Sequence, residues 1–135
     1  MTMVEMILSK IKIDESRNDQ VIVLKEKEGS RLLPVVIGIA EVNAIKLKLS
    51  GIQPPRPLTH DLVLSILESL NTKLQKIIID KLQNNTFYAK LCLGVNGKEI
   101  LIDARPSDSV ALALRAASPI YVDEKVLGEA GVAEF

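Results

Sequence analysis

The sequence has little cysteine, which cross-links small secreted proteins, and few aromatic residues, which stack on nucleic-acid bases. Cys92 is its one cysteine, which excludes a disulfide framework or a zinc cluster within one chain, and we interpret it as a buried thiol. There is no tryptophan and there are only two tyrosines and two phenylalanines, so no aromatic platform for stacked bases is expected. Lys and Arg balance Asp and Glu at 17 each, which removes the simplest electrostatic argument for nucleic-acid binding. Any contact with nucleic acid should therefore go through phosphates.

Long apolar runs and nucleotide-binding signatures are also missing. No stretch approaches 18 uninterrupted apolar residues, and the first residues have no basic segment followed by an apolar one. We therefore expect a cytoplasmic protein that is not exported and has no membrane partner. The sequence also has no Gly-rich phosphate loop, no His/Glu zinc signature and no Gly-x-Ser-x-Gly nucleophile elbow.

The composition is that of one globular domain with an aliphatic core. At 135 residues the chain is long enough to bury roughly two thirds of the surface of its unfolded state. Hydrophobic residues make up 47% of it and aromatic residues 3%, so the core must consist mainly of Ile, Leu and Val.

The apolar patterns predict three strands and then a helix, twice over. In the first half we predict strands at 3–13, 20–27 and 31–37, a turn at 14–19, a helix at 39–49 and a stiff loop at 51–57 that contains three prolines. Pro34 places the third strand at an edge or a bulge, because proline donates no ladder hydrogen bond. In the helix that follows the loop, Thr59 is the expected N-cap, the end lies near Asn71, and Leu62, Ile66, Leu67 and Leu70 form one apolar face.

The second half repeats this order and ends in an acidic tail. We predict strands at 73–83, 87–95 and 99–103, a hairpin turn at Asn96-Gly97, a buried helix at 106–117, a short strand at 120–122 and a helical turn at 123–127. Residues 123–135 are expected to fray. The fold class is thus α+β, a single domain over residues 1–135 in which two antiparallel β-meanders pack against about three helices.

Two short segments concentrate the groups that can do chemistry. They are Arg56-Pro57-Leu58-Thr59-His60-Asp61 and Asp103-Ala104-Arg105-Pro106-Ser107-Asp108. Each places an arginine before a proline that opens a helix, and a carboxylate a few residues later. Helix N-termini at strand ends are common binding places for anionic ligands.

In the second segment each acidic or hydroxyl side chain has a functional and a structural interpretation. Asp103 is a candidate metal ligand or general base, or a partner of Arg105 that fixes the strand-to-helix corner. Ser107 and Asp108 are candidate site residues, or they cap the first helical turn. Arg105 suits a phosphate and a carboxylate equally well.

In the first segment the only histidine stands beside a carboxylate. His60 is a candidate general base or metal ligand, because its ordinary pKa allows proton transfer near neutrality. Neighbours on a helix do not face each other, so His60 and Asp61 need not act together, and a capping or surface role stays open for His60. Arg56 is close by, and Glu41 and Arg115 could join this site; each also has an ordinary structural role.

At these residues the chain resembles the bifunctional nuclease domain family. The resemblance lies in Val36-Ile37-Gly38, Glu41 with Ala44-Ile45, both Arg-Pro segments, Thr86-Phe87-Tyr88-Ala89, the run from Ile102 to Arg115, and Pro119-Ile120-Tyr121-Val122. It covers nearly the whole chain. The family name rests on the cutting of both DNA and RNA by some members, so the resemblance implies a nuclease with a nucleic-acid partner.

Together these observations give one leading hypothesis and one rival. The leading hypothesis is a metal-assisted phosphodiesterase that cuts DNA and RNA with little sequence preference. In it Asp103, Asp108 and Glu41 hold Mg²⁺ or Mn²⁺, and His60 or Asp61 activates water. Arg56, Arg105 and Ser107 bind the phosphate. The rival is a non-catalytic binding or regulatory module that forms a homo-oligomer, in which the same residues are caps and interface ion pairs.

Overall fold

A computed structural model describes residues 2–14 and 19–135, and in them seven strands and four helices. The strands are β1 (Met3–Asp14), β2 (Asp19–Glu26), β3 (Leu32–Ile37), β4 (Lys73–Gln83), β5 (Thr86–Val95), β6 (Lys98–Ala104) and β7 (Ile120–Asp123). The helices are α1 (Ile39–Leu49), α2 (Thr59–Ser69), α3 (Pro106–Ala116) and α4 (Glu124–Ala130). The interior of the turn predicted at 14–19 lies outside the described residues.

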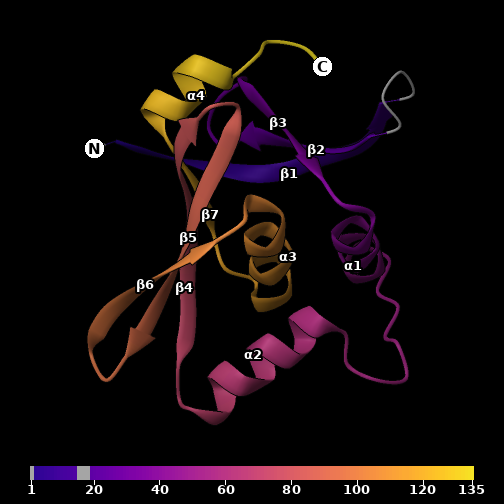
Figure 1. The fold of residues 1–135 in the computed structure, drawn as a ribbon, viewed down its shortest axis with the longest axis vertical. Coiled ribbons are helices and arrows are strands. Elements are labelled where there is room, and N and C mark those ends of the chain that lie inside the picture. Colours follow the sequence, from indigo (N-terminus) through magenta and orange to yellow (C-terminus); the bar gives the residue numbers. More distant parts are fainter. Residues whose placement is uncertain (1, 15–18) are drawn as a thin grey trace.

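All seven strands form one sheet, in the order β3-β2-β1-β7-β4-β5-β6. The two predicted meanders, β1-β2-β3 and β4-β5-β6, are therefore its two halves (Figure 1). They are joined by β7, which pairs antiparallel with β1 and parallel with β4. The expected α+β fold with two antiparallel meanders is confirmed.

Backbone preferences explain one hairpin turn and the position of one proline. Asn96 and Gly97 have φ values of 49° and 75°, and Val95 pairs with Lys98 across them, as expected for a two-residue hairpin of the primed type. Pro34 lies in β3, which is an edge strand, so its missing donor leaves no gap inside the sheet. Both predictions are confirmed.

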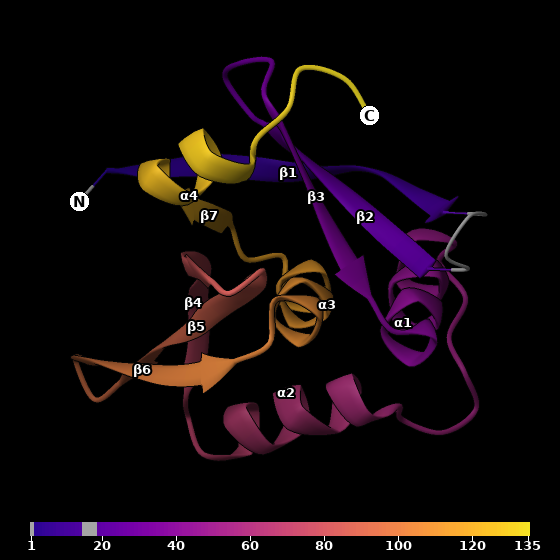
Figure 2. The same ribbon diagram turned by 45° about the horizontal axis from the view of Figure 1, so that its top comes forward.

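The core forms where the sheet curves around α3 (Figure 2). Val110 and Ala111 of this helix have no exposed surface, and they pack with aliphatic side chains from both meanders. α1 and α2 lie against α3 on the side away from β7. Because α3 contacts helices and both halves of the sheet, its few polar side chains at the two ends are held firmly in place.

The predicted N-cap of α2 is wrong by one residue. Leu58 occupies the N-cap position, and Thr59 is already helical. The carboxylate of Asp61, three residues later, accepts a hydrogen bond from the Leu58 backbone N–H at 3.0 Å. This contact satisfies the backbone N–H of the cap residue, as the acidic residue of a capping box does, although the cap residue here is a leucine.

The predicted apolar face of α2 is also wrong for most of its members. Leu62, Ile66 and Leu70 are 54%, 50% and 66% exposed. The residues packed against the core are Val63, Leu64 and Leu67. Both sets have helical spacing, so the pattern alone did not distinguish the side that faces α3 and β4 from the side that faces solvent.

The acidic tail that we expected to fray makes contacts as far as Phe135, whose carbonyl accepts a hydrogen bond from Lys10 Nζ at 2.6 Å. Val126 and Leu127 of α4 are buried, and Leu32 and Val132 exchange backbone hydrogen bonds of 2.8 Å. Arg31 joins β2 to α4 by ion pairs with Glu26 and Glu124, and the hydrogen bond from Arg31 lowers the pKa of Glu26. Among the described helices, none combines the length and apolar character needed to cross a membrane.

Candidate functional site

Two strand-to-helix corners meet at the candidate site. A single residue separates strand from helix in each: Gly38 between β3 and α1, and Arg105 between β6 and α3. Both have extended backbones and serve as N-caps without a side-chain cap hydrogen bond. Glu41 and Asp108 each occupy the third position of their helix. The equivalent corners of the two meanders therefore bring two carboxylates and one arginine together.

Arg105 holds the two carboxylates, and Asp108 in turn holds the histidine. Arg105 Nη2 donates to Glu41 Oε1 at 2.5 Å, and Arg105 Nε donates to Asp108 Oδ2 at 3.0 Å. The other oxygen of Asp108 lies 2.9 Å from His60 Nε2, at the start of α2. We call Glu41, His60, Arg105 and Asp108 the corner cluster.

The corner cluster is buried on one side and open on the other. The side chains of Glu41 and His60 are 9% and 11% exposed, whereas that of Arg105 is 68% exposed. The hydrogen bond to Asp108 raises the pKa of the Arg105 guanidinium, which stays charged. An exposed positive charge thus lies beside a buried histidine and a partly exposed carboxylate, an arrangement suited to binding an anion and moving a proton.

Gly38 is a site residue that the sequence analysis missed as such. A Cβ atom at this position would lie 2.8 Å from Glu41 Oε2, closer than side-chain contacts allow. The glycine therefore gives the Glu41 carboxylate room beside the first turn of α1. The available signal was a glycine placed directly between a strand and a helix.

A groove of about 550 Å³ opens beside Arg105, lined by residues 34–38, 85–87 and 105–107. We call it the Arg105 groove. It includes the N-terminus of α3, where Ser107 is buried and free backbone N–H groups favour negative charge. Arg105 and Ser107 were expected from the sequence to bind a ligand. Asn85, Thr86 and Phe87, at the turn from β4 into β5, also line the groove but were given no role from the sequence.

Asp61 lies in a different cluster, on the other face of α2. Its Oδ1 accepts a hydrogen bond from Arg115 Nε at 2.7 Å, and its Oδ2 accepts the Leu58 backbone N–H. The Leu58 N–H and, secondarily, Arg115 lower the pKa of this carboxyl group. Arg115, which is 7% exposed, also donates to the Ala44 carbonyl at 3.0 Å. The structure therefore places His60 and Asp61 in separate networks.

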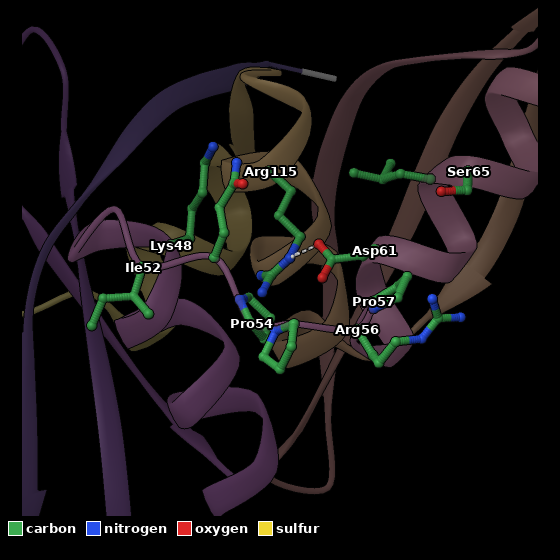
Figure 3. A pocket seen from close by; sticks show the side chains of 11 residues that line it. Lys48, Ile52, Pro54, Arg56, Pro57, Asp61, Ser65 and Arg115 are labelled. Carbon is green, nitrogen blue, oxygen red and sulfur yellow. Dashed lines mark hydrogen bonds and ion pairs between the residues drawn. The ribbon is translucent and has the colours of Figure 1, made fainter.

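Asp61 and Arg115 form part of a second pocket, of about 500 Å³, that contains Arg56 (Figure 3). We call it the Arg115 pocket. Its lining consists of residues 52–57, Lys48, Asp61, Leu64, Ser65 and Arg115. Figure 3 shows the Arg115 guanidinium between Asp61 and Pro54, while the Arg56 side chain points away from it. Arg56 and Arg105, predicted to bind one phosphate, line different pockets.

Asp103 joins neither cluster. Its side chain is 80% exposed, and the ion pair that the structure gives it is with Lys90 Nζ, at 3.8 Å. The alternative in which Asp103 pairs with Arg105 is therefore wrong. Asp103 is opposite Lys90 in the β5-β6 ladder, whereas at Arg105 the chain has already left the sheet for α3.

The arrangement of carboxylates does not fit the expected Mg²⁺ or Mn²⁺ site. Asp103 is apart, and one oxygen of Glu41 and one of Asp108 are both engaged by Arg105. Within residues 2–14 and 19–135, no three side chains of His, Cys, Asp or Glu are grouped so as to hold a metal ion. The positive charge between these carboxylates is supplied by a guanidinium.

Comparison with known proteins identifies the family. The model of the bifunctional nuclease domain matches residues 22–134, which include all four members of the corner cluster and both pockets. The chain belongs to the bifunctional nuclease domain family. The resemblance noted in the Arg-Pro segments is thereby confirmed over most of the sequence.

Relatives of this bifunctional nuclease domain occur in bacteria and plants. An uncharacterized protein of Mycobacterium tuberculosis (strain H37Rv) is 47% identical over 122 residues, which are 90% of this chain and 73% of the mycobacterial one. Bifunctional nuclease 1 of Oryza sativa subsp. japonica is 30% identical over 86% of this chain, and bifunctional nuclease 1 of Arabidopsis thaliana is 27% identical over 76% of it. The matched regions make up 36% and 33% of these plant proteins, so the chain spans about a third of their length.

Proposed function

We propose that this protein is a nuclease that hydrolyses phosphodiester bonds of DNA and RNA at the corner cluster. Membership of the family supports the activity, and the Asp108 carboxylate shared between His60 and Arg105 supports its location. That shared carboxylate is the observation on which the proposal rests most directly. It links an imidazole, which can accept or donate a proton, to an exposed positive charge.

Substrate binding in this proposal is by the phosphate alone. The phosphodiester lies in the Arg105 groove, with its oxygens on the Arg105 guanidinium and at the N-terminus of α3. The chain has only four aromatic residues, so base stacking contributes little, and contacts to phosphate carry no sequence information. Little sequence preference follows.

The chemical step needs one proton acceptor and one stabiliser of negative charge. A phosphate oxygen that takes over the Arg105 donors frees Oδ2 of Asp108, while His60 stays on Oδ1. The Asp108–His60 pair then takes a proton from the attacking water. Arg105 neutralises the negative charge that builds up on the phosphate oxygens. The bond from phosphorus to the leaving oxygen breaks, and that oxygen receives the proton held by the Asp108–His60 pair, which returns the pair to its starting state. No step is assigned to a metal ion.

Cleavage of labelled single-stranded DNA and RNA by the purified protein tests the proposal. We expect Arg105→Ala and Asp108→Asn to lower the rate by about 100-fold or more, the usual effect of removing a charge-stabilising or proton-transfer group. Asp103→Asn is the matched control, because it changes an aspartate of the same segment that is exposed and outside the cluster. It should retain full activity.

The same assay contains the outcomes that contradict the proposal. Equal trace cleavage by the wild type, Arg105→Ala and Asp108→Asn would mean contamination. Loss of activity in Asp103→Asn with full activity in Asp108→Asn would place the chemistry elsewhere. Reactions with Mg²⁺, Mn²⁺ or EDTA test the metal dependence expected from the sequence: cleavage that survives EDTA contradicts that expectation and agrees with the mechanism proposed here, which assigns no step to a metal ion.

A non-catalytic oligomeric module is the second candidate function. The observation that favours it is β6, an edge strand whose Ile100, Leu101 and Ile102 are 42%, 53% and 42% exposed. In this alternative the corner cluster only ties α1, α2 and α3 together. It predicts a folded oligomer in which Arg105→Ala has no activity to lose.

A further inference from the structure

The Arg115 pocket is a second site, distinct from the proposed nuclease centre. Its walls are the end of α1, the proline-containing loop at 52–57 and the first two turns of α2. It shares no lining residue with the Arg105 groove. Its volume of about 500 Å³ is within the range of small-molecule sites.

The charges that line this pocket favour an anion. Lys48, Arg56 and Arg115 supply three positive charges against the one negative charge of Asp61. Both oxygens of Asp61 already accept hydrogen bonds, from Arg115 and from the Leu58 backbone. The lining side chains therefore carry two more positive charges than negative ones, which favours an anion over a cation or a neutral ligand.

Arg115 adds an independent observation that points to a ligand. Its side chain is more than nine-tenths buried; its Nε donates to Asp61 and its Nη2 to the Ala44 carbonyl. Its Nη1 is buried as well and has no hydrogen-bond partner among the described residues. Buried donors without an acceptor are uncommon in proteins, and an anionic oxygen is the acceptor that suits a guanidinium.

We propose that the Arg115 pocket binds a phosphate monoester, either as a free nucleotide or as the terminal phosphate of a nucleic-acid strand. A monoester carries a charge of about −1.5 to −2 near neutrality, which matches the surplus of the pocket. A phosphodiester carries only one negative charge. The unpartnered Nη1 of Arg115 suits one phosphate oxygen, and Ile52, Leu64 and the prolines offer apolar surface to a sugar or base.

Calorimetric titration of the full chain tests this site without measuring activity. The probes are inorganic phosphate, thymidine 5′-monophosphate, and a short oligothymidylate with and without a 5′-phosphate. We expect the phosphorylated probes to bind at least about tenfold more tightly than the unphosphorylated strand, because charge-assisted hydrogen bonds to the monoester carry the binding. A preference for the monophosphate or for the phosphorylated strand identifies the source of the phosphate.

Variants of exposed residues keep the test separate from folding. Lys48→Ala with Arg56→Ala should weaken binding of the phosphorylated probes by about tenfold or more. Lys46→Ala is the matched control, because it removes a basic residue of α1 that does not line the pocket. It should bind as the wild type does.

Arg105→Ala separates this inference from the proposed function. It should lower the cleavage rate by about 100-fold or more and leave the preference for phosphorylated over unphosphorylated probes unchanged, because Arg105 lies outside the Arg115 pocket. The inference is overturned if the wild type binds phosphorylated and unphosphorylated strands equally. It is also overturned if the Lys48/Arg56 double variant binds phosphate as tightly as the wild type. Neither outcome would affect the proposed nuclease centre.

Discussion

Three helices of this protein have an acidic residue at the third position, and the three side chains serve different purposes. Asp61 turns back to its own helix and accepts the Leu58 N–H. Glu41 and Asp108 instead accept hydrogen bonds from Arg105, at the corner between β6 and α3. Helix capping is thus the complete explanation of none of them, since Asp61 also binds Arg115.

Asp61→Asn should destabilise the fold at neutral pH. The change removes the charge opposite the buried guanidinium of Arg115, and hydrogen bonds to charged groups contribute about 1.5 to 3 kcal/mol. We expect a loss of about 2 kcal/mol in the free energy of unfolding, measured by urea denaturation at pH 7. Asp103→Asn, at an exposed position, should change it by less than about 0.5 kcal/mol.

The Asp61 contribution should depend on pH in the acid range. The folded-state pKa of Asp61 is lowered, so its carboxylate stabilises the fold fully above the unfolded value of about 3.9. That contribution is lost as the pH falls through the lower, folded-state pKa. The stability difference between the wild type and Asp61→Asn should therefore shrink below about pH 4. A difference that stays constant on acidification would contradict the role assigned to this ion pair.

At the residue scale the sequence singled out side chains that meet in the structure, but not how they are grouped. Arg105, Asp108 and His60 were named from the two Arg-Pro segments and Glu41 from the helix predicted at 39–49, and these four form one cluster. The separation of Asp61 from this cluster depends on how α2 is rotated against α3. The rotation of α2 relative to α3 cannot be read from sequence periodicity, because this rotation results from how the two helices pack.

At the scale of the elements, α3 ends in a strained residue. Ala117 is its C-cap and has a left-handed backbone conformation, with φ 54° and ψ 38°. Glycine is the usual residue at such positions, since a Cβ atom there raises the conformational energy.

Ala117→Gly should therefore stabilise the protein by about 0.5 to 1 kcal/mol, measured as a rise in the free energy of unfolding. The matched control is Ala116→Gly, one residue earlier and still helical, which should be destabilising by a similar amount because glycine is a poor helix former. Equal effects of the two substitutions would contradict the strain argument.

Local chemistry predicted the elements themselves well. The Asn96-Gly97 turn and the edge position of Pro34 follow from backbone preferences that hold in any context. The inward face of α2 did not follow, because Leu62 and Ile66 on one side and Val63 and Leu67 on the other all have helical spacing. Only the position of α3 and β4 selects between them.

At the scale of the whole molecule, the two edges of the sheet differ. The β3 edge contains Pro34 and is covered in part by the bridge from Leu32 to Val132. The β6 edge contains no proline and presents Ile100, Leu101 and Ile102 to solvent. Unprotected apolar edge strands are places where sheets associate.

We predict that this protein is a homo-oligomer that associates through β6. Ile100→Thr with Ile102→Thr keeps the preference for a strand and removes apolar surface, so it should shift the oligomer to a monomer of 14.8 kDa. Light scattering after size-exclusion chromatography measures this. Ile7→Thr, at a 46% exposed position in β1, is the control and should leave the mass unchanged. A monomeric wild type would contradict the prediction.

The position of β7 has a consequence for how the chain reaches its native state. This strand comes late in the sequence, yet it is the middle strand of the sheet and the link between the two meanders. Ile120 must find Met6, more than a hundred residues earlier, before the halves are joined. Contacts of such long sequence separation slow folding, because the entropy of closing a large loop is lost before the contact forms. During synthesis, the edges of β1 and β4 that face β7 therefore stay unpaired until residues 120–123 have emerged from the ribosome.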